Sequence, residues 1–565
     1  MSHPDHEPSA AARQLQAGLD LQAGGFLDEA MAAFRQGLAA ASDGPPGQGQ
    51  DKEVADLHFR LGNACLLRGD LDPAAENYKA ALRINTSLTS CWCNLGNVYL
   101  RQDRAQDAIA IFLHALSLDS SHWAARSNLV EALVVTRQFI IARGLLLEMI
   151  VDRPQDAKLR HQLGKVHFEL NDIESALASL REAIAIDPQD ADSNYWIGGI
   201  LQRTGDDEGA QRAYAAAARL RPLIRKPAKT GVAAFRVLAL YAPFGGNTPT
   251  EYLFRDASYD VNTLALFSDQ GFDAEALKPE ADLVVNLISD ADQADAADGM
   301  LSVAADLVDR INKTTLNDPR KISRTTRESV AAILQGIAGC RVPRVLRCGA
   351  GADMVAMARE AAWPVSFPVL ARPAGTHGGD DFEMIGDIAG LEDFAARFAA
   401  SDRYLIEYID YRSRDGFFRK YRFIFVGDEI LPYHLAIGDS WKLHHDNTDM
   451  ENHLWMQQEE AAFLDHPESV FTPANYAALR AIRDAVGLDY SGIDCGLNAA
   501  GELVVFEANA SMLVHDHNER FPYKAGAVQR IKLAFDAMLH RRALAARLVD
   551  APPQTVRQGP PATAA

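Results

Sequence analysis

The first two fifths of the chain repeat one pattern of small and large apolar residues every 34 positions. A small residue, valine in one case, recurs at Gly62, Gly96, Val130, Gly164 and Gly198. An alanine follows each of them twelve positions later, and four positions after that stands a larger residue: Tyr78, Phe112, Leu146, Leu180 and Tyr214. A unit of two helices with this pattern cannot bury its apolar face alone. The pattern predicts a right-handed stack of helix pairs, with small residues where the helices of a unit meet and larger residues between units.

A sixth unit, carried by Gly18, Ala30 and Phe34, precedes the irregular insert GPPGQGQDKEV. The pattern as a whole resembles the tetratricopeptide repeat (TPR) and covers residues 11–222. This resemblance implies a concave groove that binds a peptide or protein partner. Repeat arrays also serve as dimer surfaces or spacers, and these roles stay open.

The second half of the chain does not continue the 34-residue repeat and has a different pattern of apolar runs. Residues 223–235 combine prolines, basic residues and small residues, which predicts a linker. Between residues 236 and 342, short apolar runs alternate with helical patterns, which predicts a small parallel sheet covered on both sides and a helix leading out of it. Between residues 343 and 545 the runs lie closer together and predict a second, mainly antiparallel sheet. The proline-rich tail, residues 546–565, has little to bury and is predicted to be disordered.

The hairpin near the C-terminal end carries acidic residues within apolar runs. Glu507 and Asn509 share one strand face, and Phe506 is expected on the other. If the hairpin closes through residues 498–501, Asp494 lies beside Glu507, and the two anions repel unless a cation separates them. Oxygen ligands of this kind suit Mg²⁺ or Mn²⁺. The pattern predicts a metal site, although carboxylates at the rim of a hairpin are also common.

Three further segments carry candidate chemistry. Arg372 ends an apolar strand and precedes a glycine-rich turn, whose backbone amides can approach oxyanions closely. Glu407 interrupts an apolar strand where it could meet the edge of an adenine. A basic cluster crowds the start of another strand, and in an acidic protein it suggests phosphate or carboxylate binding: Arg419, Lys420 and Arg422.

The order of these segments resembles the ATP-grasp superfamily, in particular D-alanine:D-alanine ligase, glutathione synthetase and the ribosomal-protein glutamate ligases. The motifs that carry the resemblance are FPVLARP, YLIEYI, RFIFVGDE, YSGIDCG and VVFEANAS, within residues 236–544. The fold class expected for the whole chain is therefore multidomain: an all-α TPR solenoid followed by an α/β plus α+β ATP-grasp fold. The resemblance implies that ATP lies between two α+β subdomains.

The same resemblance assigns roles to residues. It implies adenine near Glu407 and Tyr408, and phosphates under a loop that contains Gly375, Gly378 and Gly379. Arg372 and Arg327 stand where the family commonly has phosphate-binding lysines, and this exchange keeps the charge while changing its geometry. Asp494, Glu507 and Asn509 match the family's Mg²⁺ ligands.

The implied reaction is ADP-forming ligation of a carboxylate to an amine, or to a thiol, through an acylphosphate. Arg422 and Lys442 are the candidates for stabilising charge on the transferred phosphate. Four histidines near the site could accept a proton, fix a substrate carboxylate, bind a metal or only make loops polar: His444, His445, His515 and His517. Met512 and Leu513 replace the family's Pro-Gly, which leaves the substrate open.

Two alternatives remain beside a ligase that recruits its substrate through the TPR array. One is a non-catalytic TPR scaffold whose ATP-grasp module senses ATP. The other is a ligase for small metabolites that the array dimerises.

Charge and cysteine content limit the expected binding partners and cellular compartment. A formal net charge of −20 argues against general binding of nucleic acid or anionic membranes. The sequence shows neither a signal core nor a membrane-spanning apolar run. Six cysteines are few for 565 residues, so we expect a cytoplasmic protein without disulfides.

Overall fold

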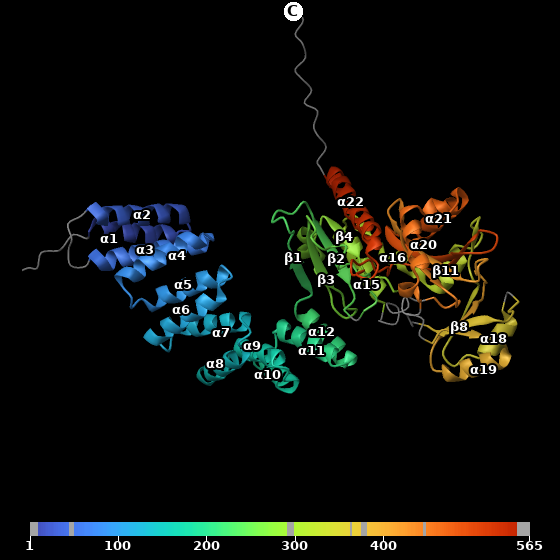
Figure 1. Cartoon of the computed structure of the whole chain (residues 1–565), viewed down its shortest axis with the longest axis horizontal. Helices are drawn as coiled ribbons and strands as arrows, with labels where there is room; N and C mark the ends of the chain where they lie inside the picture. Colours follow the sequence, from blue (N-terminus) through green and yellow to red (C-terminus); the bar gives the residue numbers. More distant parts are fainter. Residues whose placement is uncertain are drawn as a thin grey trace, which may run out of the picture. The chain divides into compact units, whose positions relative to one another are not determined.

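The computed structural model describes residues 9–43, 50–243, 245–290, 299–361, 364–374, 381–443 and 448–550 (Figure 1). The chain divides into two compact units, residues 1–217 and 218–565. Within the described ranges we find no helix with the length and apolar character needed to cross a membrane.

The first unit is built from helices that pack pairwise along the chain (Figure 1). In order they are α1 (Ala10–Ala23), α2 (Leu27–Asp43), α3 (Gln50–Arg68), α4 (Leu71–Ile84), α5 (Thr89–Arg101), α6 (Ala105–Leu118), α7 (Trp123–Val135), α8 (Phe139–Asp152), α9 (Ala157–Glu169), α10 (Ile173–Ile186), α11 (Ala191–Arg203) and α12 (Asp207–Leu220). The predicted all-helical solenoid is confirmed.

The repeated glycines have a steric cause. A methyl group at Gly96 would lie 2.5 Å from the ring of Phe112, and one at Gly62 would lie 2.7 Å from the ring of Tyr78. The small residues therefore mark the close approach of two helices, as predicted. The large residues do more than fill the space between units, because each lies against the glycine of its own unit.

The second unit begins with a five-stranded sheet in the order β1-β3-β2-β4-β5. Its strands are β1 (Leu223–Lys226), β2 (Arg236–Tyr241), β3 (Asp260–Ala265), β4 (Leu283–Asn286) and β5 (Thr315–Leu316). The last four are parallel, as predicted. The linker prediction is wrong for residues 223–226, because this segment pairs antiparallel with β3 and covers its edge.

Helices connect the strands of the parallel sheet to one another and lead from its last strand to the rest of the unit. They are α13 (Ala274–Leu277), η1 (Lys278–Glu280), α15 (Met300–Ile311), α16 (Pro319–Ile322), η2 (Ser323–Thr325) and α17 (Arg327–Ile333).

The region predicted as one antiparallel sheet forms two. The four-stranded sheet has the order β7-β10-β8-β9, from β7 (Val345–Cys348), β8 (Val369–Pro373), β9 (Glu383–Ile385) and β10 (Arg403–Glu407). Its own small core packs with α18 (Met354–Glu360) and α19 (Ile388–Arg397), which lie beside β8 in Figure 1.

The five-stranded antiparallel sheet has the order β12-β11-β13-β14-β6. Its strands are β6 (Cys340–Arg341), β11 (Phe418–Val426), β12 (Glu429–Gly438), β13 (Tyr490–Leu497) and β14 (Leu503–Asn509), and only β6 is parallel to its neighbour. The remaining helices are η3 (Met450–Asn452), α20 (Leu454–Asp465), η4 (Pro467–Ser469), α21 (Pro473–Val486), η5 (Pro522–Lys524) and α22 (Ala525–Asp550).

The C-terminal helix α22 corrects the predicted tail. It includes residues 546–550, and Arg547 donates a hydrogen bond to the carbonyl of Ala234 at 2.6 Å. Disorder is therefore wrong for these five residues, because the helix continues and docks. The prediction for residues 551–565 lies outside the described part of the chain.

Different helices cover the two faces of the five-stranded antiparallel sheet. Phe423 and Ile493 belong to the core that includes α20 and α21. Ile424 and Val426 point the opposite way and pack with α22. Arg422 precedes Ile424 by two positions and shares its face. The polar end of β11 therefore begins where apolar packing against α22 stops.

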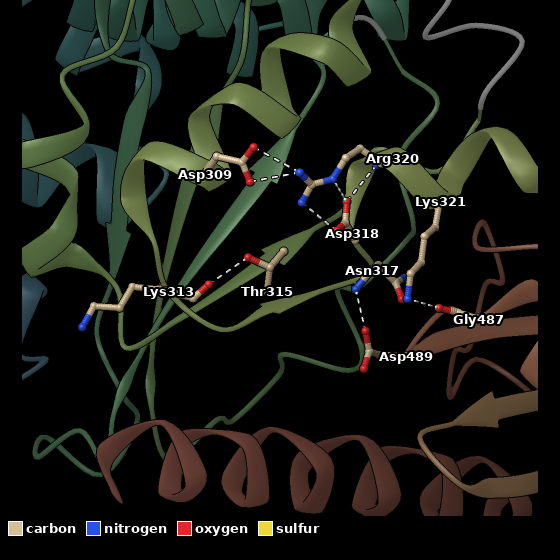
Figure 2. A network of polar contacts seen from close by, with 9 residues as sticks. All are labelled: Asp309, Lys313, Thr315, Asn317, Asp318, Arg320, Lys321, Gly487 and Asp489. Carbon is tan, nitrogen blue, oxygen red and sulfur yellow. Dashed lines mark hydrogen bonds and ion pairs between the residues drawn. The ribbon is translucent and has the colours of Figure 1, made fainter. Parts of the chain in front are cut away.

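Asn317 fastens the parallel sheet to the start of β13, and Figure 2 shows its contact with Asp489, the residue before that strand. Its side chain is buried, donates to the Tyr490 carbonyl at 2.8 Å and accepts from the Tyr490 amide at 2.8 Å. The Asn317 backbone amide donates to Asp489 at 2.9 Å. One asparagine thus imitates a strand partner and fixes the start of β13, the strand that carries Asp494.

Candidate active site

Four polar residues form one row across four neighbouring strands. His434 on β12 stands opposite Arg422 on β11, Arg422 opposite Asp494 on β13, and Asp494 opposite Glu507 on β14. Directly paired residues share a sheet face, so these side chains are neighbours. The predicted pairing of Asp494 with Glu507 is confirmed.

Two β-bulges border this row. The register shifts between Arg422 and Phe423, which leaves Tyr433 as the extra residue of β12. It also shifts between Asp494 and Cys495, which leaves Phe506 as the extra residue of β14. We expected Phe506 to face away from Glu507, but both line the same cavity, because the bulge re-aims the extra residue.

Asp494 is almost fully buried and already neutralised by cations. The Arg422 guanidinium donates to its two oxygens at 2.6 and 2.8 Å, and the Lys420 Nζ lies 3.3 Å away. Burial acts to raise the pKa of Asp494, but the charges of Arg422 and Lys420 outweigh it and hold that pKa well below its usual range. Asp494 is therefore ionised at neutral pH.

The other two predicted metal ligands lie beside it. Asn509 donates a hydrogen bond from Nδ2 to Glu507 Oε1, and Arg327, the first residue of α17, lies 3.5 Å from Glu507 Oε2. The Asn509 Oδ1 atom is buried and has no hydrogen-bond partner among the described residues. An unpaired buried carbonyl oxygen next to two carboxylates is the donor set that a hard divalent cation needs.

One cavity of about 250 Å³ collects most residues that the sequence singled out. Nine of them line it: Arg327, Arg372, Glu407, Tyr408, Lys420, Arg422, Lys442, Asp494 and Glu507. They come from both antiparallel sheets, from α17 and from the loops beside them. The predicted phosphate-loop residues Gly375, Gly378 and Gly379 lie outside the described part of the chain.

Phe382 organises two cations at this cavity. Its ring centroid lies 5.4 Å from the guanidinium of the buried Arg372, and its carbonyl accepts a hydrogen bond from Lys442 Nζ at 3.2 Å. At the end of β10, Glu407 Oε2 accepts from the Arg344 amide at 3.1 Å. Burial raises the pKa of Tyr408, which stays protonated. Cations and apolar surface therefore meet in one space.

The sequence did not indicate the aromatic walls of the cavity. Phe382, Tyr411, Trp441 and Phe506 all line it. Phe382 and Trp441 pack edge to face with centroids 5.2 Å apart. Both stand in polar loops, where a large aromatic residue has no strand or helix to pack into. Their position in such loops was the sequence feature that could have indicated a role in the cavity.

A second cavity of about 700 Å³ lies at the His434 end of the row, whereas Glu507 at the opposite end lines the first cavity. It shares Lys420, Arg422 and Asp494 with the first cavity. His515 and His517 line it, whereas His444 and His445 lie outside the described residues.

A buried acid, Glu460 on α20, is part of the lining of the second cavity. Its Oε1 lies 2.5 Å from His434 Nδ1 and 3.0 Å from Lys524 Nζ, and its Oε2 accepts from Tyr523 at 2.7 Å. Burial opposes its ionisation, but these partners, His434 first, lower the pKa of Glu460 to about 2. Sequence reasoning missed His434, Glu460 and Lys524.

Family models of the tetratricopeptide repeat match parts of the first unit. TPR repeat models match residues 55–103 and 164–205, and a tetratricopeptide repeat model matches residues 89–122. A BBSome complex member, BBS4, of Bos taurus is 25% identical over 197 residues, 29% of this chain. Anaphase-promoting complex subunit 3 of Dictyostelium discoideum is 28% identical over 135 residues, 24% of this chain. The chain spans 38% and 14% of the lengths of these two curated relatives.

Solved structures also resemble part of the chain. MamA from Desulfovibrio magneticus RS-1 is 21% identical, with a TM-score of 0.29, over 30% of this chain and 94% of its own. PilF of Pseudomonas aeruginosa is 18% identical, with a TM-score of 0.31, over 38% of this chain and 92% of its own. The matches to the repeat models show tetratricopeptide repeats within residues 55–122 and 164–205.

Proposed function

We propose that residues 236–545 form an ATP- and Mg²⁺-dependent ligase that joins a carboxylate to an amine or thiol through an acylphosphate. The TPR array would recruit the peptide or protein partner. The observation that carries the proposal is the meeting of Arg422, Asp494 and Glu507 in one cavity that has further cations and apolar surface in its lining.

The first cavity suits a nucleoside triphosphate. Leu370, Ile406 and Phe382 offer apolar surface for a flat base, and Arg372 and Lys442 offer fixed positive charge for phosphates. Phosphoryl transfer depends mainly on positioning and charge neutralisation, so a cavity of this composition needs no covalent nucleophile.

The oxygen donors suit a divalent cation. Asp494, Glu507 and Asn509 are adjacent, and the buried Asn509 Oδ1 has no hydrogen-bond partner among the described residues. Mg²⁺, or Mn²⁺, bound by these three residues would neutralise charge on the nucleotide phosphates. Because Arg422 donates hydrogen bonds to both oxygens of Asp494, at least one of these bonds must break before Asp494 can bind the cation. The freed guanidinium would then be next to the nucleotide phosphates.

In the proposed reaction, different cations of the cavity bind the phosphates and stabilise the developing charge. Arg372 and Arg327 hold phosphate oxygens, and Arg422 with Lys442 stabilises the charge that develops as the substrate carboxylate attacks the terminal phosphate. The amine subsequently displaces phosphate from the acyl carbon. The second cavity lies on the far side of Arg422 and gives the acceptor its own approach.

One observation favours a second candidate, an ATP-sensing scaffold without ligase activity. Arg422 and Lys420 already compensate Asp494, so the acidic cluster is stable without a metal. A pseudoenzyme could retain such a cluster for structural reasons.

A screen for ADP release separates these candidates. The full chain is incubated with ATP, Mg²⁺, single amino acids and short peptides, beside Glu507→Gln and Arg372→Ala. Ligase function predicts ADP release that requires an added acceptor and falls at least roughly tenfold in both variants. Nucleotide binding without turnover across the screen would favour the sensor, and turnover that survives both substitutions would contradict the site.

Recruitment by the TPR array is tested separately. A partner bound by the array should show a lower KM as a peptide or protein than the same acceptor does as a free amino acid. Equal KM values would contradict recruitment and would favour an array that dimerises a small-metabolite ligase.

A further inference from the structure

His434 extends the polar row toward the second cavity. It stands one strand from Arg422 and two strands from Asp494, and its ring lines the 700 Å³ cavity. About a fifth of its side chain, 22%, is exposed. A ligand in this cavity therefore contacts the imidazole of His434 and also Lys420 and Arg422, the two cations that the cavity shares with the proposed phosphate-binding cavity.

Glu460 orients the imidazole. Two groups contact His434 Nδ1: Glu460 Oε1 at 2.5 Å and Lys524 Nζ at 2.9 Å. Lys524 Nζ also lies 3.0 Å from Glu460 Oε1 and can donate to that carboxylate. Because the contact with the carboxylate is the shorter one, we assign the proton to Nδ1 and the lone pair to Nε2. Glu460 is 1% exposed and is itself fixed by the Leu435 amide at 3.1 Å and by Tyr523 at 2.7 Å. Among the described residues, no partner occupies Nε2.

The surroundings keep the imidazole neutral. Glu460 faces it from α20, Lys524 and Tyr523 from η5, and Arg422 from β11. Burial lowers the pKa of His434, and the nearby charges of Lys524 and Arg422 lower it further against the opposing effect of Glu460. A neutral imidazole can accept a proton at pH 7.

We propose that His434 is the general base that deprotonates the amine acceptor, with its Nε2 atom pointing to the acceptor side of the row. The role rests on the ligase function proposed above. An acceptor that arrives as an ammonium passes one proton to Nε2 and becomes a free amine. Its lone pair forms the C–N bond, the acyl C–O bond breaks, and phosphate leaves with the bonding electrons. The second N–H proton goes to that phosphate, and His434 returns its own proton to water.

Two acceptors separate this role from phosphoryl transfer. An amino acid needs the base, whereas hydroxylamine is already unprotonated at neutral pH and does not. His434→Asn is the appropriate variant, because the asparagine amide can still donate to Glu460 while the Nε2 lone pair is lost. His466→Asn, at the exposed C-terminal end of α20, is the control.

The assay uses the full chain with ATP, Mg²⁺ and the amino acids of the screen as carboxylate donors. We expect His434→Asn to lower amide formation roughly 10²- to 10⁴-fold and to leave hydroxamate formation within about threefold of the wild type. Equal losses with both acceptors, or an unchanged amide rate, would overturn the proposal for His434 alone. A wild-type chain that forms no hydroxamate with any acid would refute the ligase function, and the base with it.

Two further measurements exclude a merely structural effect. The wild-type amide rate should fall as pH drops through a value below the ordinary histidine pKa, about 6.5, while the hydroxamate rate should not follow that curve. Melting temperature and ATP affinity of His434→Asn should match those of His466→Asn. Glu460→Gln, a change in a positioning residue, should move the pH profile of amide formation only.

Discussion

The Asp494 carboxylate accepts two hydrogen bonds from one side chain on β11, the Arg422 guanidinium that stands directly opposite it, and Lys420 of the same strand lies 3.3 Å away. A bidentate pair fixes the relative position of two strands as well as two charges. Its burial also links the geometry of the site to the stability of the sheet.

Removing Arg422 should be costly. Arg422→Leu leaves the buried Asp494 with only Lys420, and we expect a loss of about 3–5 kcal/mol in the free energy of unfolding at pH 7. Urea unfolding followed by circular dichroism measures it. The double variant Arg422→Leu/Asp494→Leu should recover most of the loss, because it removes the unpaired charge as well.

The same pair predicts an acid dependence. Because folding holds the pKa of Asp494 below its usual value, the carboxylate stabilises the protein above about pH 4, and this contribution is lost as pH falls further. In Arg422→Leu the Asp494 carboxylate loses its main cationic partner, so its pH-dependent contribution to the free energy of unfolding becomes smaller. Urea midpoints between pH 3 and pH 7 should therefore differ most between wild type and variant at the upper end. A constant difference would contradict the assigned ionisation.

Glu507→Gln should abolish the effect of metal on nucleotide binding. It keeps the shape of Glu507 but removes one anionic ligand, so we expect the affinity for a non-hydrolysable ATP analogue with Mg²⁺ to fall at least roughly tenfold. Calorimetric titration with Mg²⁺ and with EDTA measures this. Glu429→Gln, at the exposed start of β12, is the matched control and should bind like the wild type.

Asn317 should be more important than its exposed neighbours. Asn317→Ala leaves the amide and carbonyl of Tyr490 without partners, which should cost about 2–4 kcal/mol in the free energy of unfolding. Because Asn317 has a φ of 53°, Asn317→Gly should cost less than alanine. Arg320→Ala removes only half-exposed ion pairs to Asp309 and Asp318 and should stay within about 1 kcal/mol (Figure 2).

The repeat glycines offer a test in the first unit. Gly96→Ala forces a methyl group into the ring of Phe112, which should destabilise the array by about 1–3 kcal/mol. Gly96→Ala/Phe112→Leu should recover part of this, because Val130 and Leu146 form a comparable pair one repeat later. Thermal unfolding of the three variants measures the effect, and no recovery would contradict the steric explanation.

The repeat array was predictable because its spacing is strictly periodic and each unit contacts mainly its neighbours. The parallel strands were predictable from short apolar runs. Local composition could not show that residues 223–226 pair with β3, because that pairing joins segments more than thirty positions apart. The same holds for Asn317, whose partner Tyr490 is 173 positions away.

The row across the sheet shows where sequence reasoning stops. Counting back from the turn at Val426 and Glu429 places Tyr433 opposite Arg422, and only the bulge brings His434 there. Counting back from Leu497 and Leu503 likewise places Phe506 opposite Asp494, although the true partner is Glu507. The hairpin closure expected through residues 498–501 suggested that Asp494 lies beside Glu507, but no sequence signal suggested the pairing of Arg422 with His434.

The two bulges also bear on how such a protein can change. Each bulge inserts one aromatic residue between two regular stretches of pairing, so a deletion of Tyr433 or Phe506 would leave His434 opposite Arg422, or Glu507 opposite Asp494, in continuous register. A codon can therefore be lost at either bulge while the polar row keeps its alignment. The same alignment fails if a hairpin pairs without skipping its aromatic residue, because Tyr433 or Phe506 then takes the place of the polar side chain.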